Sequence, residues 1–171
     1  MDSFSNCSSN LASSLENAQK NDKITAMIKE LLRATKLKDL MIAKLITVHE
    51  NDEFHVVWEK MAVFGIRHLP VLNDAGCVVG LISQRHLYKI HSPRHLEDGS
   101  WYYDKEMLDG FILKNVMFVD PYTLTPEHTL EDAMKAMVES QLGCIPIVDK
   151  YLLPQGIVTR VDVIKFFLKH A

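Results

Sequence analysis

The first regular pattern along the chain is a stripe of apolar residues at helical spacing. Between residues 22 and 35, apolar side chains recur every three or four positions: Ile24, Met27, Ile28, Leu31 and Leu32. This spacing predicts an amphipathic helix over 22–35, with Asn21 or Asp22 as its N-cap. We expect this helix to cover the core of the following region or to form a dimer contact. Residues 1–21 are rich in Ser and Asn and are expected to form a mobile tail.

Beyond this helix, the apolar pattern predicts a short helical turn, a short strand, a helix, two strands joined by a turn, and a final helix. The expected positions are 38–41 for the helical turn, 45–48 for the strand, a helix capped by Asp52, strands at 68–72 and 77–83 around a turn at 73–76, and a helix through Leu87 and Ile90. The predicted elements of this region therefore include both helices and strands.

The same set of elements follows again at a constant offset of 76 residues, since 146 − 70 = 76 for Pro146 and Pro70. No gap is needed from Asp39/Asn115 to His86/Asp162. The offset also pairs Met41 with Met117, Thr47 with Thr123, Met61 with Met137, Gly80 with Gly156 and Ser83 with Thr159. A fixed period over this length indicates one supersecondary unit used twice.

Several features of the second copy are clear from its own residues. Thr129 and Asp132 form the pattern of a capping box, and strands are expected at 144–148 and 156–159. Pro70 and Pro146 cannot donate a backbone hydrogen bond, so each is expected at a strand start or edge.

The domain organisation follows from the repeat. It comprises a tail over 1–21, a helix over 22–35, a first repeat over 36–91, an excursion over 92–110 and a second repeat over 111–171. The aromatic run at 101–103 predicts that the excursion is packed, with a partner-binding patch as the alternative.

Composition narrows the class of protein. The net charge of −3 gives no electrostatic reason to expect nucleic-acid binding. The three cysteines, at 7, 77 and 144, have no CxxC spacing, which fits a reducing compartment. No signal peptide and no apolar run long enough to span a membrane is visible. A cytoplasmic protein that binds neither nucleic acid nor membrane is therefore expected.

Each copy resembles a CBS domain, the β-α-β-β-α module named after cystathionine β-synthase. The resemblance covers roughly residues 36–170 and rests on motifs that recur in the same order in both copies. These motifs are Asp39–Met41, Arg67–Val71 and Gly80–Ser83 in the first copy, and Asn115–Met117, Gly143–Asp149 and Gly156–Asp162 in the second. The resemblance implies an α+β fold of two pseudo-symmetric repeats packed sheet to sheet, with ligands that contain adenosine bound in the clefts between them.

The second copy carries the clearer ligand site. After the strand that ends near Thr159, a helix begins, and its free N–H groups favour phosphate. Asp162 lies one helical turn further, and a carboxylate accepts hydrogen bonds from two ribose hydroxyls. In the family, the matching Thr and Asp contact phosphate and ribose. Arg160 lies between them, and Cys144, Ile145 and Pro146 are expected as the wall. The alternative is that Thr159 and Asp162 form only a capping box.

The first copy departs from this pattern. Ser83 matches Thr159, but His86 replaces Asp162, and an imidazole cannot hold both ribose hydroxyls. Arg67 and His68 add charge where the second copy has uncharged residues. Because the two clefts face each other, we expect these two side chains to serve the phosphates of a ligand seated at Asp162. The alternative is that both are solvated surface groups.

The family resemblance also implies where the adenine ring lies. The segment that leads into the first strand of the opposite copy forms the slot, which gives Ile42 and Ile46 for the second site. For the first site it gives Phe118 and Tyr122. Such residues are often simple core instead.

These observations predict a non-catalytic sensor or regulatory module for AMP, ADP, ATP or S-adenosylmethionine, with no obligatory cofactor. A structural or interaction protein with vestigial sites is the alternative, and a small enzyme is disfavoured because no nucleophile–base pair is visible. No metal-ligand spacing is present, and only Cys144 is a candidate reactive thiol. Exposed helix stripes that include Trp58 and Met134 predict a homodimer, and the protein target is left open.

Overall fold

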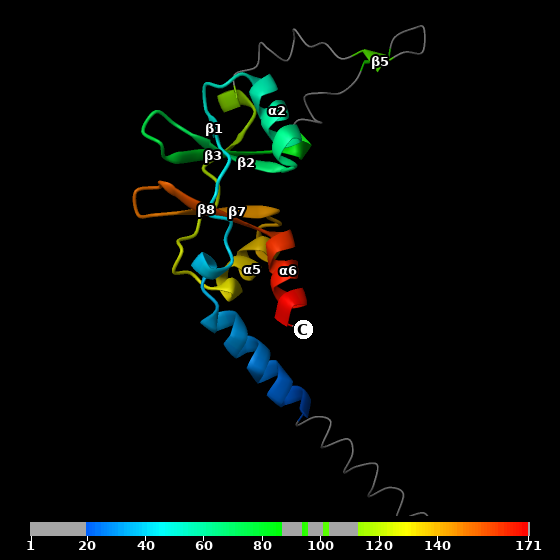
Figure 1. Ribbon diagram of the computed structural model, residues 1–171, viewed down its shortest axis with the longest axis vertical. Coiled ribbons are helices and arrows are strands. Elements are labelled where there is room, and N and C mark those ends of the chain that lie inside the picture. Colours follow the sequence, from blue (N-terminus) through cyan, green and yellow to red (C-terminus); the bar gives the residue numbers. More distant parts are fainter. Residues whose placement is uncertain (1–19, 87–93, 96–100, 103–112, 171) are drawn as a thin grey trace, which may run out of the picture.

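The computed structural model describes residues 20–86, 94–95, 101–102 and 113–170. Residues 20–34 are helical, so Asn21 and Asp22 lie inside this helix and neither is its N-cap. The helix projects from one end of the molecule, away from the two repeats (Figure 1). Residues 20–30 are exposed throughout, which contradicts the expectation that the helix covers the core within one chain. The tail over 1–19 lies outside the described residues.

The described elements follow the predicted order in both repeats. The first repeat contains η1 (Leu37–Asp39), β1 (Val48–His49), α2 (Phe54–Phe64), β2 (His68–Leu72) and β3 (Val78–Ser83). The second contains η2 (Leu113–Asn115), β6 (Phe118–Val119), α5 (Leu130–Glu139), β7 (Cys144–Val148), β8 (Pro154–Thr159) and α6 (Arg160–His170). Between them, β4 (Arg94–His95) pairs antiparallel with β5 (Trp101–Tyr102). The remainder of the excursion, and the helix expected through Leu87 and Ile90, lie outside the described residues, although Gln84–His86 are helical.

The two repeats exchange their first segments. One sheet has the order β1-β2-β3-β6, so the first strand of the second repeat joins the sheet of the first. In return, Ile42 of the first repeat exchanges two backbone hydrogen bonds with Ile157 of β8, at 2.9 and 3.1 Å. The two sheets lie next to each other, with α2 on one outer side and α5 and α6 on the other (Figure 1). The expected α+β architecture, with repeats packed sheet to sheet, is confirmed.

This exchange also completes both hydrophobic cores. The core of the second repeat takes in Leu37, and the core of the first takes in Leu113 and Met117. Each entering methionine lies over a glycine of the opposite sheet. A Cβ atom at Gly156 would lie 2.6 Å from Met41 Sδ, and one at Gly80 would overlap Met117. Met41 and Met117, and likewise Gly80 and Gly156, recur at the 76-residue offset because they form two equivalent contacts, one on each sheet.

Local chemistry explains the ends of the elements. Thr129 and Asp132 form the predicted capping box of α5, and Gly65 ends α2 in the left-handed conformation. The expected cap of α2 was wrong by one residue: Glu53 is the N-cap, and Asp52 instead accepts a hydrogen bond from His49 N–H at 2.9 Å. The predicted first strand, 45–48, is shorter and lies later, at Val48–His49.

The two prolines do not lie at strand starts. Each is the third residue of a five-residue strand, β2 or β7. In β2, however, β1 pairs only with Val71 and Leu72, so no strand of the described part of the chain has Pro70 itself as a pairing partner on the side away from β3. The missing N–H therefore falls at a local edge of the sheet, as the chemistry of proline requires.

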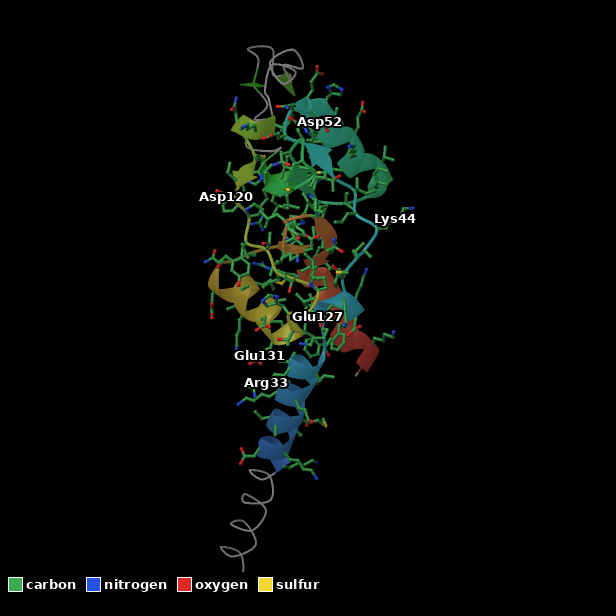
Figure 2. All side chains as sticks on the ribbon, turned by 90° about the vertical axis from the view of Figure 1, so that its left-hand side faces the viewer. Arg33, Lys44, Asp52, Asp120, Glu127 and Glu131 are labelled. Carbon is green, nitrogen blue, oxygen red and sulfur yellow. The ribbon has the colours of Figure 1, made fainter. Side chains whose placement is uncertain are left out.

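The 76-residue offset also relates Lys44 and Asp120, since 120 − 44 = 76. These two residues lie on opposite sides of the molecule (Figure 2).

Candidate ligand site between the repeats

Thr159 and Asp162 lie together at the junction of β8 and α6. Asp162 Oδ2 accepts hydrogen bonds from Thr159 N–H at 2.9 Å and from the Thr159 hydroxyl at 2.6 Å. Asp162 N–H in turn donates to Thr159 Oγ1 at 3.3 Å. This is a capping box, the alternative that the sequence left open. All three bonds use one carboxylate oxygen or the hydroxyl, so Oδ1 stays available to a ligand within the described part of the chain.

The equivalent junction of the first repeat uses a histidine for the same purpose. His86 Nδ1 accepts a hydrogen bond from Ser83 N–H at 3.0 Å and lies 3.2 Å from Ser83 Oγ. Since Nδ1 accepts this bond, it is unprotonated, and the imidazole substitutes for the capping carboxylate. The ring therefore stabilises the turn, but unlike a carboxylate it has no oxygen that could accept a hydrogen bond from a ribose.

Basic side chains gather where the two repeats meet. His68 Nε2 would lie 3.0 Å from a Cβ atom at Gly143, so His68 of the first repeat lies against the second. Burial lowers the pKa of His68 first, and the nearby basic groups Arg67, Arg85, His86 and Arg160 lower it further. The structure thus brings His68 next to Arg160, the residue that follows Thr159. His68 is half-buried while Arg67 is exposed, so only Arg67 fits the description of a surface group.

Arg160 has a second function that the sequence did not reveal. Its Nε donates to Leu142 O at 2.7 Å, and its N–H donates to Gly143 O at 3.2 Å. The first repeat makes the same backbone contact, from Gln84 N–H to Arg67 O at 3.0 Å. Arg85 also belongs to this group of cations and was missed. The 76-residue offset could have identified Arg85, because it pairs this cation with the uncharged Val161.

The expected slot residues lie on the exchanged segments. Ile42 is exposed and pairs with β8, and Ile46 is half-buried. Phe118 and Tyr122, the equivalents for the first site, are exposed. Ile42, Phe118 and Tyr122 are therefore open to a ligand, whereas Ile46 also packs against the core of the first repeat.

The side chains of the expected wall residues are buried. Cys144, Ile145 and Pro146 are buried, and Ile145 belongs to the core of the second repeat. Cys144 is 2% exposed, and burial raises the pKa of its thiol to about 12. The expectation of a reactive thiol at this position was therefore wrong, because the thiolate is strongly disfavoured there.

Asp162 also lines an open groove of about 560 Å³ between α6 and the segment that links the N-terminal helix to the first repeat. Leu31, Asp39 and Leu40 line it from the linking side, and Phe166 lines it from α6. The sequence did not indicate this groove, because its two walls are more than 100 residues apart. It connects the candidate site to the N-terminal helix.

Among the described residues, no group of three His, Cys, Asp or Glu side chains is placed to hold a metal ion. In the same part of the chain, no helix has both the length and the apolar character to cross a membrane.

The sequence matches the CBS domain family over residues 37–92 and 113–169. The chain therefore belongs to the CBS domain family and carries two tandem copies, as predicted. It is 27% identical over 134 residues to a CBS domain-containing protein of Dictyostelium discoideum. This match covers 78% of this chain and 91% of that protein. It is also 27% identical over 142 residues to a homoserine O-acetyltransferase of Methanococcoides burtonii, of which it spans only 26%. The chain spans 26% to 52% of the length of the first three curated relatives.

Solved structures share the fold. The CBS domain pair of protein MJ0100, in complex with 5′-methylthioadenosine and S-adenosyl-L-methionine, superposes with a TM-score of 0.67 at 21% identity. CBSX2 in complex with AMP gives a TM-score of 0.66 at 22% identity. Each alignment covers 80% of this chain and 98% of the other. At this level of identity, the likeness establishes the architecture.

Proposed function

We propose that this protein is a regulatory module that binds a ligand containing adenosine between its two repeats. The observation that carries the proposal is the junction at Thr159 and Asp162. A carboxylate with one uncommitted oxygen lies there on the first turn of α6, opposite the segment of the first repeat that includes Ile42. Two proteins of the same fold were solved with AMP or with S-adenosyl-L-methionine and 5′-methylthioadenosine, which supports this choice of ligand class.

In the proposed complex, the ribose hydroxyls donate to Asp162, and the phosphates lie near the start of α6. The N-terminus of that helix favours negative charge. Arg67 and His68 come from the other repeat, and His68 lies against Gly143 beside this junction. A ligand with phosphates would therefore touch both repeats, and its differential affinity for two arrangements of the repeats would produce the signal.

The two clefts are proposed to differ. His86 uses Nδ1 to hold the helix start, so the first cleft lacks a group that accepts from both ribose hydroxyls. We expect one strong site for adenosine and one weak or empty site. The same observation favours a second candidate function, an interaction protein in which the capping role of Asp162 is all that remains of the site.

Calorimetry separates these two functions. The protein is titrated with AMP, ADP, ATP, S-adenosyl-L-methionine and NAD, and the same ligands are tested for an increase in melting temperature. Asp162→Ala should weaken the best ligand by about ten- to a hundredfold, because it removes hydrogen bonds to a charged group worth roughly 1.5–3 kcal/mol.

The matched control is Asp132→Ala. Asp132 forms the same capping box with Thr129 at the start of α5, so both variants should lose about 1 kcal/mol of stability from the lost cap. Only Asp162→Ala should lose affinity. If no ligand binds, the interaction-protein function holds. If both variants bind the ligand equally well, a ligand site exists but Asp162 is not part of it.

A further inference from the structure

The N-terminal helix carries an apolar stripe that nothing in the described chain covers. Ile24, Met27 and Ile28 are 42%, 64% and 43% exposed. An isolated helix of about 15 residues is marginally stable in water, and most helices gain their stability from a packed apolar face. This helix therefore needs a partner along most of its length.

The exposed part of the stripe lies N-terminal to the contacts that the helix makes with its own repeats. At 100° per residue, Arg33 lies on the side of the helix opposite Ile24 and Leu31. Arg33 Nε is bonded to Glu131 Oε2 of α5 at 2.8 Å, at the base of the helix (Figure 2). Leu32, on the flank next to Ile28, packs against the core of the second repeat. The contacts to the body thus come from the last turns of the helix, and Ile24, Met27 and Ile28 lie outside them.

The charges beside the stripe decide which partner fits. Lys23 and Glu30 flank it on one edge, whereas Asn21, Thr25 and Leu32 lie along the other edge. Two copies of this helix packed antiparallel about a two-fold axis bring like edges together. With the axis between Met27 and Ile28, each Lys23 lies within about 3 Å, along the helix axis, of the level of Glu30 in the other copy. The pairing therefore forms two reciprocal ion pairs.

The same arrangement matches the apolar positions. Ile24 of each copy lies level with Leu31 of the other, and the two Met27–Ile28 pairs meet at the axis. Leu31 is half-buried and lines the groove with Leu40 and Phe166, so the apolar surface continues from the stripe into the body. Asp22, Lys29 and Arg33 lie on the far side of the helix and do not oppose the contact. Lys20 lies on the stripe side, but at its N-terminal end, where it is level with Thr35 of the other copy and beyond the four apolar residues.

We propose that the N-terminal helices of two copies of this chain pair antiparallel through Ile24, Met27, Ile28 and Leu31, with reciprocal Lys23–Glu30 ion pairs. The projection of the helix from the body, seen in Figure 1, leaves room for such a contact at the end of the molecule. This pairing goes beyond the proposed ligand site and does not depend on it, so a failure of one leaves the other unaffected.

A zero-length cross-link tests the pairing directly. A carbodiimide joins a lysine amine to a carboxylate in contact. Lys23 and Glu30 of one helix are separated by about 10 Å along its axis, too far for such a bond. The full chain is mixed in ¹⁴N and ¹⁵N forms at on the order of 100 µM, cross-linked and analysed by mass spectrometry. A mixed ¹⁴N–¹⁵N peptide that joins Lys23 to Glu30 is expected, and its absence overturns the proposal.

Charge reversal gives the second measurement. Lys23→Glu and Glu30→Lys each place like charges opposite one another and should weaken association through this helix about tenfold. An equimolar mixture of the two variants restores both ion pairs, so mixed dimers should dominate in native mass spectrometry. Lys29→Glu changes charge on the far side and is the matched control. If the mixture shows no preference for mixed dimers, or if Lys29→Glu has the same effect as Lys23→Glu, the pairing is wrong.

Discussion

The two repeats differ at the third residue of the helix that follows their last strand, which begins at Gln84 in the first repeat and at Arg160 in the second. Asp162 and His86 are equivalent, and both hold the start of a helix by accepting a hydrogen bond from the residue three positions earlier. The carboxylate does this with one oxygen and keeps the other, whereas the imidazole uses its acceptor nitrogen. The histidine therefore preserves the helix start of the first repeat, but it lacks the second oxygen that the proposed site of the second repeat offers to a ribose.

His68 gives a prediction on stability at this scale. Burial and the surrounding cations lower its pKa in the folded protein, so the unfolded chain binds a proton more readily. Stability should then fall as the pH drops below about 6.5, where the unfolded histidine becomes charged. His68→Gln should lose less stability than the wild-type protein between pH 7.5 and pH 5.5, measured by chemical denaturation. Equal losses in the two proteins would show that His68 is not the group responsible.

At the scale of elements, the exchanged segments hold the two repeats together. Met41 and Met117 each lie over a glycine of the opposite sheet, and the Cβ position at Gly156 is also 3.1 Å from Ile42 O. The backbone oxygen cannot move without disturbing the pairing of Ile42 with Ile157. The exchange therefore depends on the absence of a side chain at this position.

Gly156→Ala should consequently destabilise the protein by about 1–3 kcal/mol through overpacking. Gly143→Ala is a useful comparison, because its added Cβ would meet only the ring of His68, which can rotate away. A smaller loss is expected for Gly143→Ala in urea denaturation. If Gly156→Ala is as stable as the wild-type protein, the Met41 contact does not constrain the sheet.

The repeat made most of these elements predictable, since a pattern seen once is weak and the same pattern seen twice at one offset is strong. The strands at Cys144–Val148 and His68–Leu72 and the capping box at Thr129 agree with prediction. The short first strand was misplaced because its apolar residues face a core shared by both repeats. The site was predicted less well: Cys144 and Ile145 fit the motif, but their side chains are buried in the core.

For the whole molecule, exposed apolar residues on α2 support the expected homodimer. Trp58 and Phe64 are exposed, and Val63 is 76% exposed, whereas Met134 packs against the core of the second repeat and is a poorer contact than expected. Val63→Glu should remove the association through α2 and leave only the separate contact of the N-terminal helices, which sedimentation velocity detects as a shift to smaller species, because it places a charge in an apolar contact. Gln155→Glu adds the same charge at an exposed position of β8 and should have no effect. A wild-type monomer at tens of micromolar (roughly, for an interface of moderate affinity) would exclude the dimer.

The central claim is that one ligand, seated at Asp162, bridges the two repeats through its phosphates. The most direct measurement is the calorimetric affinity of Arg67→Ala and Asp162→Ala for adenosine and for ATP. Arg67 carries a permanent charge and a forked set of donors suited to phosphate. Asp162→Ala should therefore weaken adenosine and ATP by a similar factor, whereas Arg67→Ala should weaken ATP much more than adenosine. If Arg67→Ala lowers the affinity for both ligands by the same factor, the bridging account is contradicted.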